Sequence, residues 1–329
     1  MLRLFKWSFF AVLLGSLGFA GWFLWSVSQP LSLKQLEFNI DPGMGLKQVS
    51  RRLADSGMGV SPWQFTLLAR ALGKSADIKA GSYEVEAGLN AWLLLEKLTH
   101  GDTSQGELAL IDGWSLRQVR AAMDANIALR HDSKMLTEKE ILQRLGVPDG
   151  SLEGLLFPDT YLFPKNSSDL ELLGRAYRAM QRHLQVEWTG RTADVPYRSA
   201  YEALIMASIV EKETGVAADR GKVASVFINR LRLGMPLQTD PTVIYGMGEA
   251  YAGSLRRKDL LRDTVYNTYT RAGLPPTPIA MPGLASLKAA LHPEKTAYLY
   301  FVARGDGSSQ FSPDLDSHNR AVNRYIRHK

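Results

Sequence analysis

The 329-residue sequence contains no cysteine, which excludes disulfides, thiolate nucleophiles and cysteine-ligated zinc sites. It also lacks a phosphate-binding loop of the GxxxxGK[ST] type, so the sequence offers no such site for the phosphates of a nucleotide. Its six histidines are scattered and show no metal-binding spacing, and Ser208 lacks the G-x-S-x-G surroundings of a serine hydrolase. We therefore expect neither a metal nor a cofactor.

The remaining composition is that of an ordinary globular protein, with 45% hydrophobic and 22% charged residues. The formal net charge of +6 suits anionic partners such as lipids, acidic glycans or nucleic acid, but it does not choose among them.

Charge is absent from residues 7–27, WSFFAVLLGSLGFAGWFLWSV, a run just long enough to cross the hydrocarbon core as a helix. Arg3 and Lys6 precede it, which predicts a cytoplasmic N-terminus and export of everything after Ser28. A cleaved signal peptide is the rival interpretation, because Gly18–Ala20 resembles a cleavage site. The apolar run continues through Trp22–Val27, which favours a retained membrane anchor.

A degenerate repeat follows Pro30, in GMGLKQVSRRL (43–53), GLNAWLLLEKL (88–98) and GWSLRQVRAAM (113–123). Each copy offers a helix N-cap, at Gly45, Asn90 and Ser115, and then an apolar stripe at helical spacing. Strand-like runs precede the copies: LEFNI, SYEVE and ELALI. The pattern predicts β-turn-α units with a further helix over 62–72. A generic α+β module without a ligand fits the same pattern.

The second half alternates predicted helices with polar loops. Helices are expected over 169–188, 199–214, 221–234 and 284–292, with a hairpin over 297–314 and a basic helix at the end. Proline and glycine predict irregular loops over 153–164, 235–248 and 265–283. These loops carry the candidate binding residues Glu153, Asp159, Gln238, Asp240, Tyr266, Asn267 and Tyr269.

Two glutamates, Glu211 and Glu213, end the apolar helix over 199–214. Residues two apart on a helix project about 200° from each other, so at most one of them faces a given cleft. Glu213 continues the buried stripe of Met206 and Ile209, and is therefore the candidate.

The helix dipole and partial burial both raise the pKa of a carboxyl group in the last helical turn. A carboxyl group that keeps its proton near neutral pH can act as a general acid. The structural alternative is a glutamate at a helix end, paired with Lys212 or Arg220.

Many segments resemble the endolytic murein transglycosylase family (MltG, YceG-like), from about residue 35 to the C-terminus. They are KAGSYEV, LTHGD, EGLLFPDTY, IVEKET, KVASVFINRLRLGMPLQTDPTVIYGMG, YNTYTRAGLPPTPIAMPG, SLKAALHP and YLYFVA. The resemblance implies cleavage of nascent peptidoglycan between MurNAc and GlcNAc, leaving 1,6-anhydro-MurNAc ends. It places the catalytic glutamate, the second one of the EKE motif, on Glu213.

Together with the apolar N-terminal run, the resemblance implies an α+β architecture in four parts. These are a cytoplasmic N-terminus (1–6), a transmembrane helix (7–27), a LysM-like subdomain (28–112) and a mixed α+β catalytic domain (113–329). The expected location is the inner membrane, single-pass, with the catalytic domain in the periplasm. Expected partners are glycan strands, membrane lipid, penicillin-binding synthases and the elongation or division machinery, and no nucleic acid.

Two other functions remain open from the sequence. One is a hydrolytic muramidase, which would add water instead of forming the anhydro ring. The other is a non-catalytic, membrane-anchored scaffold that binds glycan.

Overall fold

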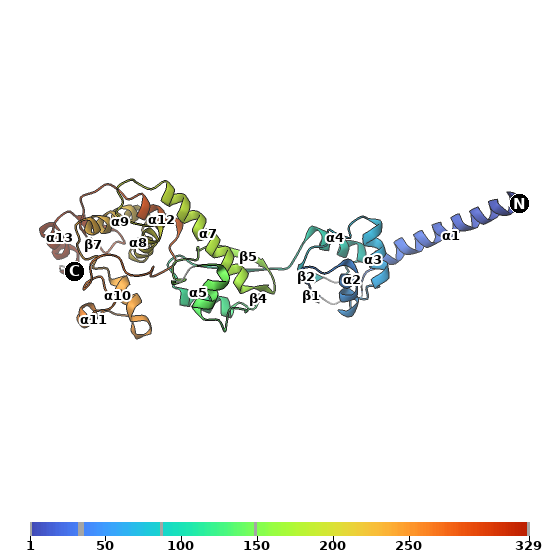
Figure 1. Ribbon diagram of the computed structural model, residues 1–329, viewed down its shortest axis with the longest axis horizontal. Helices are drawn as coiled ribbons and strands as arrows, with labels where there is room; N and C mark the ends of the chain where they lie inside the picture. The colour runs from blue at the N-terminus through green and yellow to red at the C-terminus, as the bar shows by residue number, and fades with distance from the viewer. Residues whose placement is uncertain (1, 32–35, 86–87, 148–149, 328–329) are drawn as a thin grey trace. The chain divides into compact units, whose positions relative to one another are not determined.

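The structure is a computed structural model that describes residues 2–31, 36–85, 88–147 and 150–327 (Figure 1). The chain forms two compact units: unit 1 comprises 1–107 with 162–167, and unit 2 comprises 108–161 with 168–329. The divisions fall inside three strands, which are β3 (Gln105–Ala109), β5 (Thr160–Pro164) and β6 (Ser167–Ser168). The domain boundary predicted after residue 112 stays a prediction.

Unit 1 begins with helix α1 (Leu2–Ser28), whose segment Phe9–Ser28 is long and apolar enough to cross a membrane. The last turns of α1 are part of the core of unit 1. Phe23 and Val27 are buried there, and the ring of Trp22 stacks on that of Trp63, with centroids 6.1 Å apart. Helix α1 is therefore packed against the rest of unit 1.

The rest of unit 1 consists of two antiparallel strands, β1 (Leu36–Ile40) and β2 (Gly81–Val85), packed with short helices. The helices are α2 (Leu46–Asp55), α3 (Pro62–Ala71) and α4 (Ala91–His100). The β-turn-α repeat is confirmed, including the Asn90 cap, whose side chain accepts a hydrogen bond from the Leu93 amide at 2.9 Å. Apolar stripes of α2 and α4 fill the core as their spacing predicts.

Unit 2 is mainly helical (Figure 1). Its elements before the loop at 190–199 are α5 (Leu116–Ala125), β4 (Leu129–Arg130), α6 (Glu138–Leu145) and α7 (Asp169–Thr189). The later elements are α8 (Ala200–Glu213), α9 (Ala217–Arg232), α10 (Asp240–Met247), η1 (Gly248–Ala250), α11 (Arg257–Leu261) and α12 (Leu284–Leu291). Strands β7 (Tyr300–Ala303) and β8 (Ser309–Ser312), α13 (Leu315–Val322) and η2 (Asn323–Arg327) complete the described chain.

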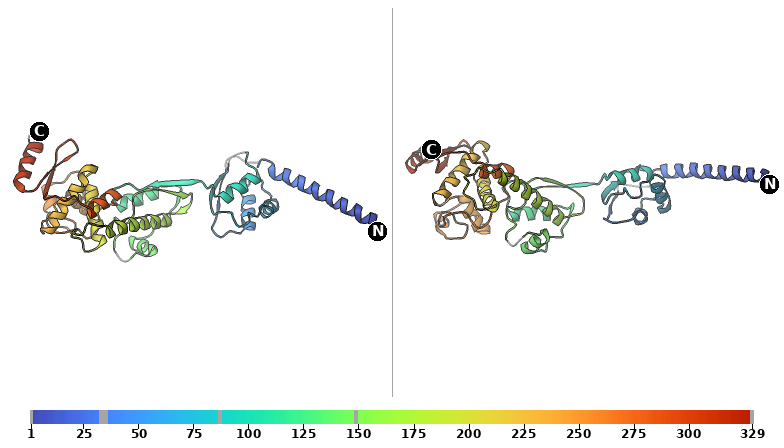
Figure 2. Two further views of the ribbon diagram at one scale, coloured as in Figure 1. Left: turned by 90° about the horizontal axis from the view of Figure 1, so that it is seen from above. Right: turned by 45° about the horizontal axis from the view of Figure 1, so that its top comes forward.

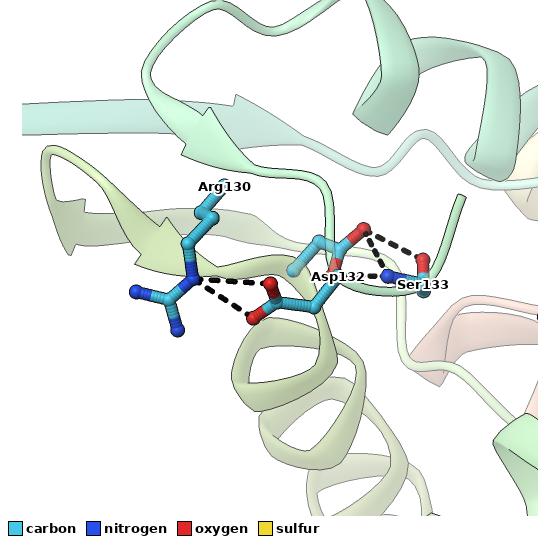
Figure 3. Close-up of polar contacts among 4 residues, drawn as sticks. Arg130, Asp132 and Ser133 are labelled. Carbon is cyan, nitrogen blue, oxygen red and sulfur yellow. Dashed lines mark hydrogen bonds and ion pairs between the residues drawn. The ribbon is translucent and has the colours of Figure 1, made fainter. Parts of the chain in front are cut away.

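A buried carboxylate fixes the start of α7. Asp169 is fully buried and accepts hydrogen bonds from Ser133, at 3.0 Å from the amide and 2.6 Å from the hydroxyl. Figure 3 shows Ser133 beside the ion pair of Arg130 with Asp132, whose nearest atoms are 3.0 Å apart. Burial of Asp169 is tolerated because its oxygens are satisfied.

Helix α8 is the central element of unit 2. Its residues from Ala203 to Val210 are all buried, because α7, α9 and α12 pack around it. A helix that is apolar all round belongs inside a bundle. The consequence for function is that the C-terminal end of α8, with its two glutamates, is held by the whole bundle.

Two expectations about loops are wrong. Residues 160–164 form a strand, in which Pro164 is tolerated because both strands of a two-stranded sheet are edge strands. Residues 240–247 form α10, because Pro241 lies in the first turn, where a helix needs no backbone donor. The segment 265–283 is irregular as predicted.

The C-terminal segment of unit 2 is the antiparallel hairpin β7–β8 followed by α13 (Figure 2). This hairpin confirms the one expected over 297–314. Helix α13 packs on both strands, and the predicted terminal helix is therefore also confirmed.

Candidate active site

The two glutamates at the end of α8 have different neighbours. Glu211 accepts a hydrogen bond from the Gly283 amide at 3.0 Å, at the start of α12. Glu213 instead accepts one from the hydroxyl of Thr239, in the segment that leads into α10. Glu211 therefore links two helices, while Glu213 turns toward a cavity.

A cluster of buried threonines supports the Glu213 carboxyl group. The Thr239 amide donates to the Thr268 hydroxyl at 3.1 Å, and the Thr242 hydroxyl donates to the Thr239 carbonyl at 2.8 Å. The hydroxyls of Thr242 and Thr268 lie 2.9 Å apart. All three residues are at most 2% exposed, so the position of the Thr239 hydroxyl is closely defined.

The pKa of Glu213 is raised above its ordinary value. Burial is the main cause, because it disfavours the charged form, and the negative charge of Asp240 adds to it. The hydrogen bond from Thr239 acts in the opposite direction by stabilising the carboxylate. The balance favours a carboxyl group that holds its proton to higher pH than an exposed glutamate does.

Glu213 opens onto a cavity of about 520 Å³, here called the Glu213 cavity. Its lining joins four of the sequence-predicted residues with aromatic and polar groups from the C-terminal hairpin and α13. They are Glu213, Phe227, Arg230, Leu237, Gln238, Asp240, Tyr269, Tyr300, Phe301, Leu315, His318 and Asn319.

Gln238 is held in an unusual backbone conformation at the rim of this cavity. Its φ of +53° lies in the left-handed region, which is costly for a residue with a side chain. Its amide donates to the Thr268 carbonyl at 3.0 Å, and its side-chain oxygen accepts from Arg230 at 3.2 Å. Strain of this kind persists only where the surroundings impose it.

Arg230 is the group that imposes this loop conformation. It is 7% exposed and donates to the carbonyls of Leu237 at 3.0 Å and Pro236 at 3.2 Å. A third bond reaches the Leu299 carbonyl at 2.7 Å, just before β7. Burial lowers the pKa of the guanidinium group. One arginine thus ties the cavity loop to the hairpin.

Asp240 and Tyr269 form a hydrogen-bonded pair across the cavity. The Tyr269 hydroxyl donates to the Asp240 carboxylate at 2.6 Å. Burial and this bond together raise the pKa of Tyr269. An aromatic ring held beside a carboxylate offers a sugar an apolar face and a polar edge.

A second cavity of about 600 Å³, here called the Glu153 cavity, contains two other sequence-predicted residues, Glu153 and Tyr266. Its lining also includes Lys212 and Pro241, the chain neighbours of Glu213 and Asp240. The ring of Tyr266 meets that of Tyr245 edge to face, with centroids 4.9 Å apart. The two cavities therefore flank the same junction of α8 and α10.

Glu153 is a buried carboxyl group with two donors, one of which is shared between its two oxygens. It is 3% exposed and accepts from the Leu116 amide at 2.9 Å and 3.1 Å and from the Tyr245 hydroxyl at 3.1 Å. Burial raises its pKa to about 7, although these hydrogen bonds lower it.

Two sequence-predicted residues lie outside both cavities. Asn267 is 1% exposed, and its amide group donates to the carbonyls of Leu260 and Arg262 at 3.0 Å and 2.7 Å, so it shapes the loop. Asp159 is exposed, and its carboxylate accepts from the Thr160 amide at 2.7 Å. Neither side chain lines the Glu213 cavity.

The sequence analysis did not select Thr239, Arg230 or Tyr245. Thr239 stands between two selected residues in QTDPT, but its bond to Glu213 joins positions 26 residues apart, which no local pattern reveals. Arg230 falls on the expected helix 221–234 as one of several basic residues. Among the described residues, no three His, Asp or Glu side chains are grouped to hold a metal ion.

Comparison with known proteins shows to which family this chain belongs. The model of the YceG-like family matches residues 38–324. A relative from Bacillus subtilis (strain 168), named endolytic murein transglycosylase, is 34% identical over 311 residues, 89% of this chain and 86% of its own. A relative of the same name from Streptococcus pneumoniae (strain ATCC BAA-255 / R6) is 26% identical. There the match covers 91% of this chain and 60% of the relative.

Among solved structures, a crystal structure of a YceG-like protein from Listeria monocytogenes is similar, with a TM-score of 0.55 and 30% identity. The match covers 87% of this chain and 98% of that one. Since the family model spans most of the sequence and a 34% identical relative is covered nearly end to end, the chain belongs to the YceG-like family.

Proposed function

We propose that this chain is an endolytic murein transglycosylase that cleaves peptidoglycan glycan strands, with Glu213 as its single catalytic acid and base. The observation that carries the proposal is a carboxyl group of raised pKa opening onto a cavity of saccharide size at the end of a rigid helix. The name shared by the relatives supports the same reaction.

The hydrogen bond from Thr239 supports a position for the proton on Glu213. Thr239 donates to Oε1, and Oε2 has no hydrogen-bond partner among the described residues. The acidic proton is therefore expected on Oε2. In the first step it passes to the glycosidic oxygen as the bond from that oxygen to C1 of MurNAc breaks and C1 becomes oxocarbenium-like.

The second step returns the proton. The C6 hydroxyl of the same sugar attacks C1, and the Glu213 carboxylate takes the hydroxyl proton as the new C1–O6 bond forms. The products are a 1,6-anhydro-MurNAc end and a free hydroxyl on the neighbouring GlcNAc. Because the substrate supplies its own nucleophile, the protein needs only one reacting carboxyl group.

The remaining lining residues are assigned to saccharide binding. Tyr269 presents a ring and Gln238 an amide in the Glu213 cavity, and Tyr266 and Glu153 line the adjacent cavity. We propose that a glycan strand occupies both cavities, with the cleaved linkage at the junction of α8 and α10. Asn267 contributes indirectly, by holding the Tyr269 amide at 2.8 Å.

The test compares two glutamates in one helical turn, Glu213→Gln and Glu211→Gln, in the full-length protein. Both substitutions conserve shape, and Gln at 211 can still accept from the Gly283 amide. Incubation with uncrosslinked glycan strands should show cutting reduced about 10²–10⁴-fold for Glu213→Gln and little changed for Glu211→Gln. Equal cutting by Glu213→Gln and wild type would contradict the assignment, and no cutting by wild type would favour the glycan-binding scaffold.

Hydrolysis is the second candidate, because Asp240 places another carboxylate in the Glu213 cavity. A hydrolase would use that group to activate water or to attack C1. Product masses separate the two reactions, since a reducing end is one water heavier than an anhydro end. Asp240→Asn should leave lytic cutting largely intact, whereas it would abolish hydrolysis that depends on this carboxylate.

The apolar helix α1 is consistent with a single-pass anchor. We propose a cytoplasmic N-terminus and a catalytic unit on the outer side of the inner membrane, facing the periplasm. Contacts with synthases and with the elongation or division machinery remain predictions.

A further inference from the structure

The position of α3 beside α1 limits how far unit 1 can stand from a membrane. The apolar segment Phe9–Ser28 has 20 residues, and at 1.5 Å per residue it is about as long as the hydrocarbon core is thick. Trp22 lies six residues before its end, about 9 Å along the helix axis. Because Trp63 of α3 stacks on Trp22, the start of α3 lies at membrane depth or in the headgroup layer.

Sliding α1 outward does not remove this constraint. Moving the span toward the N-terminus would bring Lys6 and then Arg3 into hydrocarbon, at a cost that rises to about 2.5–3.5 kcal/mol each at the helix centre by insertion scales. A second contact also holds α3 against the end of α1, since the Gln64 side chain donates to the Ser26 hydroxyl at 2.7 Å. The face of unit 1 around α3 therefore meets the lipid headgroups.

The side chains on this face suit an interface. Several large apolar residues near the end of α1 are exposed, namely Trp22, Trp25, Trp63, Leu67, Trp92 and Leu93. Trp92 and Leu93 start α4, whose capping residue Asn90 contacts the Ser28 carbonyl at the end of α1. Tryptophan is enriched where one side of a residue is apolar and the other is wet.

A groove of about 430 Å³ opens on the same face, here called the α2–α3 groove. Its walls are one face of α2 and one face of α3, and its lining is Lys47, Ser50, Arg51, Pro62, Trp63, Thr66, Leu67 and Arg70. The hydroxyls of Ser50 and Thr66, 2.9 Å apart, join the two helices across the groove. Trp63 belongs both to this groove and to the stack on α1.

The charge of the groove is positive. Lys47, Arg51 and Arg70 line it, all three exposed, and no described lining residue is acidic. Within the described chain none of the three forms an ion pair with Asp or Glu, whereas the neighbouring Arg52 pairs with Asp41 at 3.0 Å. The part of unit 1 after Ser28 has nine Lys or Arg and nine Asp or Glu, so its net charge is zero. The three cations of the groove are therefore a local excess of positive charge.

We propose that the α2–α3 groove binds the phosphate headgroup of an anionic phospholipid, in the leaflet at the C-terminal end of α1. Lys47, Arg51 and Arg70 surround the phosphate, and Trp63 and Leu67 contact the glycerol and upper acyl region beside it. Two observations support this occupant: the groove shares Trp63 with the stack on α1, and its positive charge complements the negative charge of the phosphate. The contact fixes which side of unit 1 faces the membrane.

The test uses the full-length chain in phosphatidylcholine nanodiscs. Since the protein has no cysteine, Leu67→Cys gives one site for a bimane label inside the groove. His100→Cys gives the control, at the opposite end of α4 from Asn90 and about 15 Å away. The quencher is a small fraction of phosphatidylglycerol or phosphatidylcholine, each with a nitroxide near the ester end of one acyl chain.

The expected result is stronger quenching at position 67 by phosphatidylglycerol than by phosphatidylcholine, and weak quenching by either lipid at position 100. Each cation near a headgroup is expected to enrich the anionic lipid about fivefold. The double substitution Arg51→Gln with Arg70→Gln should remove most of the phosphatidylglycerol excess. The matched control, Lys74→Gln with Lys79→Gln, removes as much charge from another part of unit 1 and should preserve it.

Three outcomes would overturn the proposal. Equal quenching by the two lipids at position 67 would show a surface near the membrane without a headgroup site. No quenching at position 67 would show that the groove does not reach the headgroups. An equal loss with the control pair would show that general charge, and not the groove, attracts the lipid. None of the four substituted Lys and Arg residues belongs to the hydrophobic core of unit 1, so a folding defect is not expected.

Discussion

The buried carboxyl group of Glu153 should make the stability of unit 2 depend on pH. In the folded chain its pKa is about 7, while in the unfolded chain it returns to about 4.5. A group whose folded pKa is raised contributes stability that is fully present below the unfolded pKa and is lost as pH rises through the folded pKa. The window is therefore about pH 4.5 to 7, where stability should fall as the pH increases.

The pKa difference sets the size of the effect. Each pKa unit corresponds to 1.36 kcal/mol, so forcing Glu153 to ionise in place costs about 3 kcal/mol of unfolding free energy. Glu153→Gln removes the ionisable group and keeps its shape. Its oxygen can still accept from the Leu116 amide, and its amide group can donate to the Tyr245 hydroxyl. The variant should lose this part of the pH dependence.

The assay is urea unfolding of the full-length chain in detergent at pH 5, 6, 7 and 8, followed by hydrogen exchange in peptides from α7 and α8. The difference between wild type and variant cancels the other titrating groups. We expect the variant to gain about 2–3 kcal/mol relative to wild type between pH 5 and pH 8, because part of the loss has already occurred at pH 5. A difference that stays constant across this range would refute the reasoning about desolvation of Glu153.

Three further outcomes follow from the site. Thr239→Val removes a hydrogen bond that lowers the Glu213 pKa, so it should move the alkaline limb of kcat/KM to higher pH. Asp240→Asn removes a negative charge that raises this pKa, so it should move the limb to lower pH. Shifts of both variants in the same direction would contradict Glu213 as the acid. Arg230→Met leaves three carbonyls, one buried and two partly buried, without their donor and should lower the unfolding free energy by about 3 kcal/mol in urea titrations. An unchanged midpoint would contradict this expectation. Gly154→Ala should cost about 2–4 kcal/mol in the same assay, because φ is +77° and the new Cβ would lie 2.3 Å from Pro278; a loss below about 0.5 kcal/mol would show that the loop adapts.

The sequence predicts features that depend on neighbours along the chain. The Asn90 cap, the apolar stripes of α2 and α4 and the interior helix α8 all follow from short-range patterns, and the structure contains them. Helix α10 was missed because proline usually ends helices, and only its place in the first turn allows one here.

Features that depend on tertiary contact could not be predicted. Helix phase indicates that Glu211 and Glu213 diverge, but it does not show that Thr239 holds one and Gly283 the other. Likewise, an asparagine in a polar loop can bind a ligand or shape the backbone. The two carbonyls that Asn267 contacts become visible only in the fold.

The burial of Phe23 and Val27 has a practical consequence for fragments that lack helix α1. A soluble fragment that began at Pro30 would lack Phe23 and Val27 and would leave cavities in the core of unit 1. Removing a buried phenylalanine side chain alone lowers the unfolding free energy by about 3–5 kcal/mol. Helix α1, whose apolar segment is long enough to cross a membrane, thus also completes the interior of unit 1. Proteolytic removal of α1 is therefore expected to loosen the rest of unit 1.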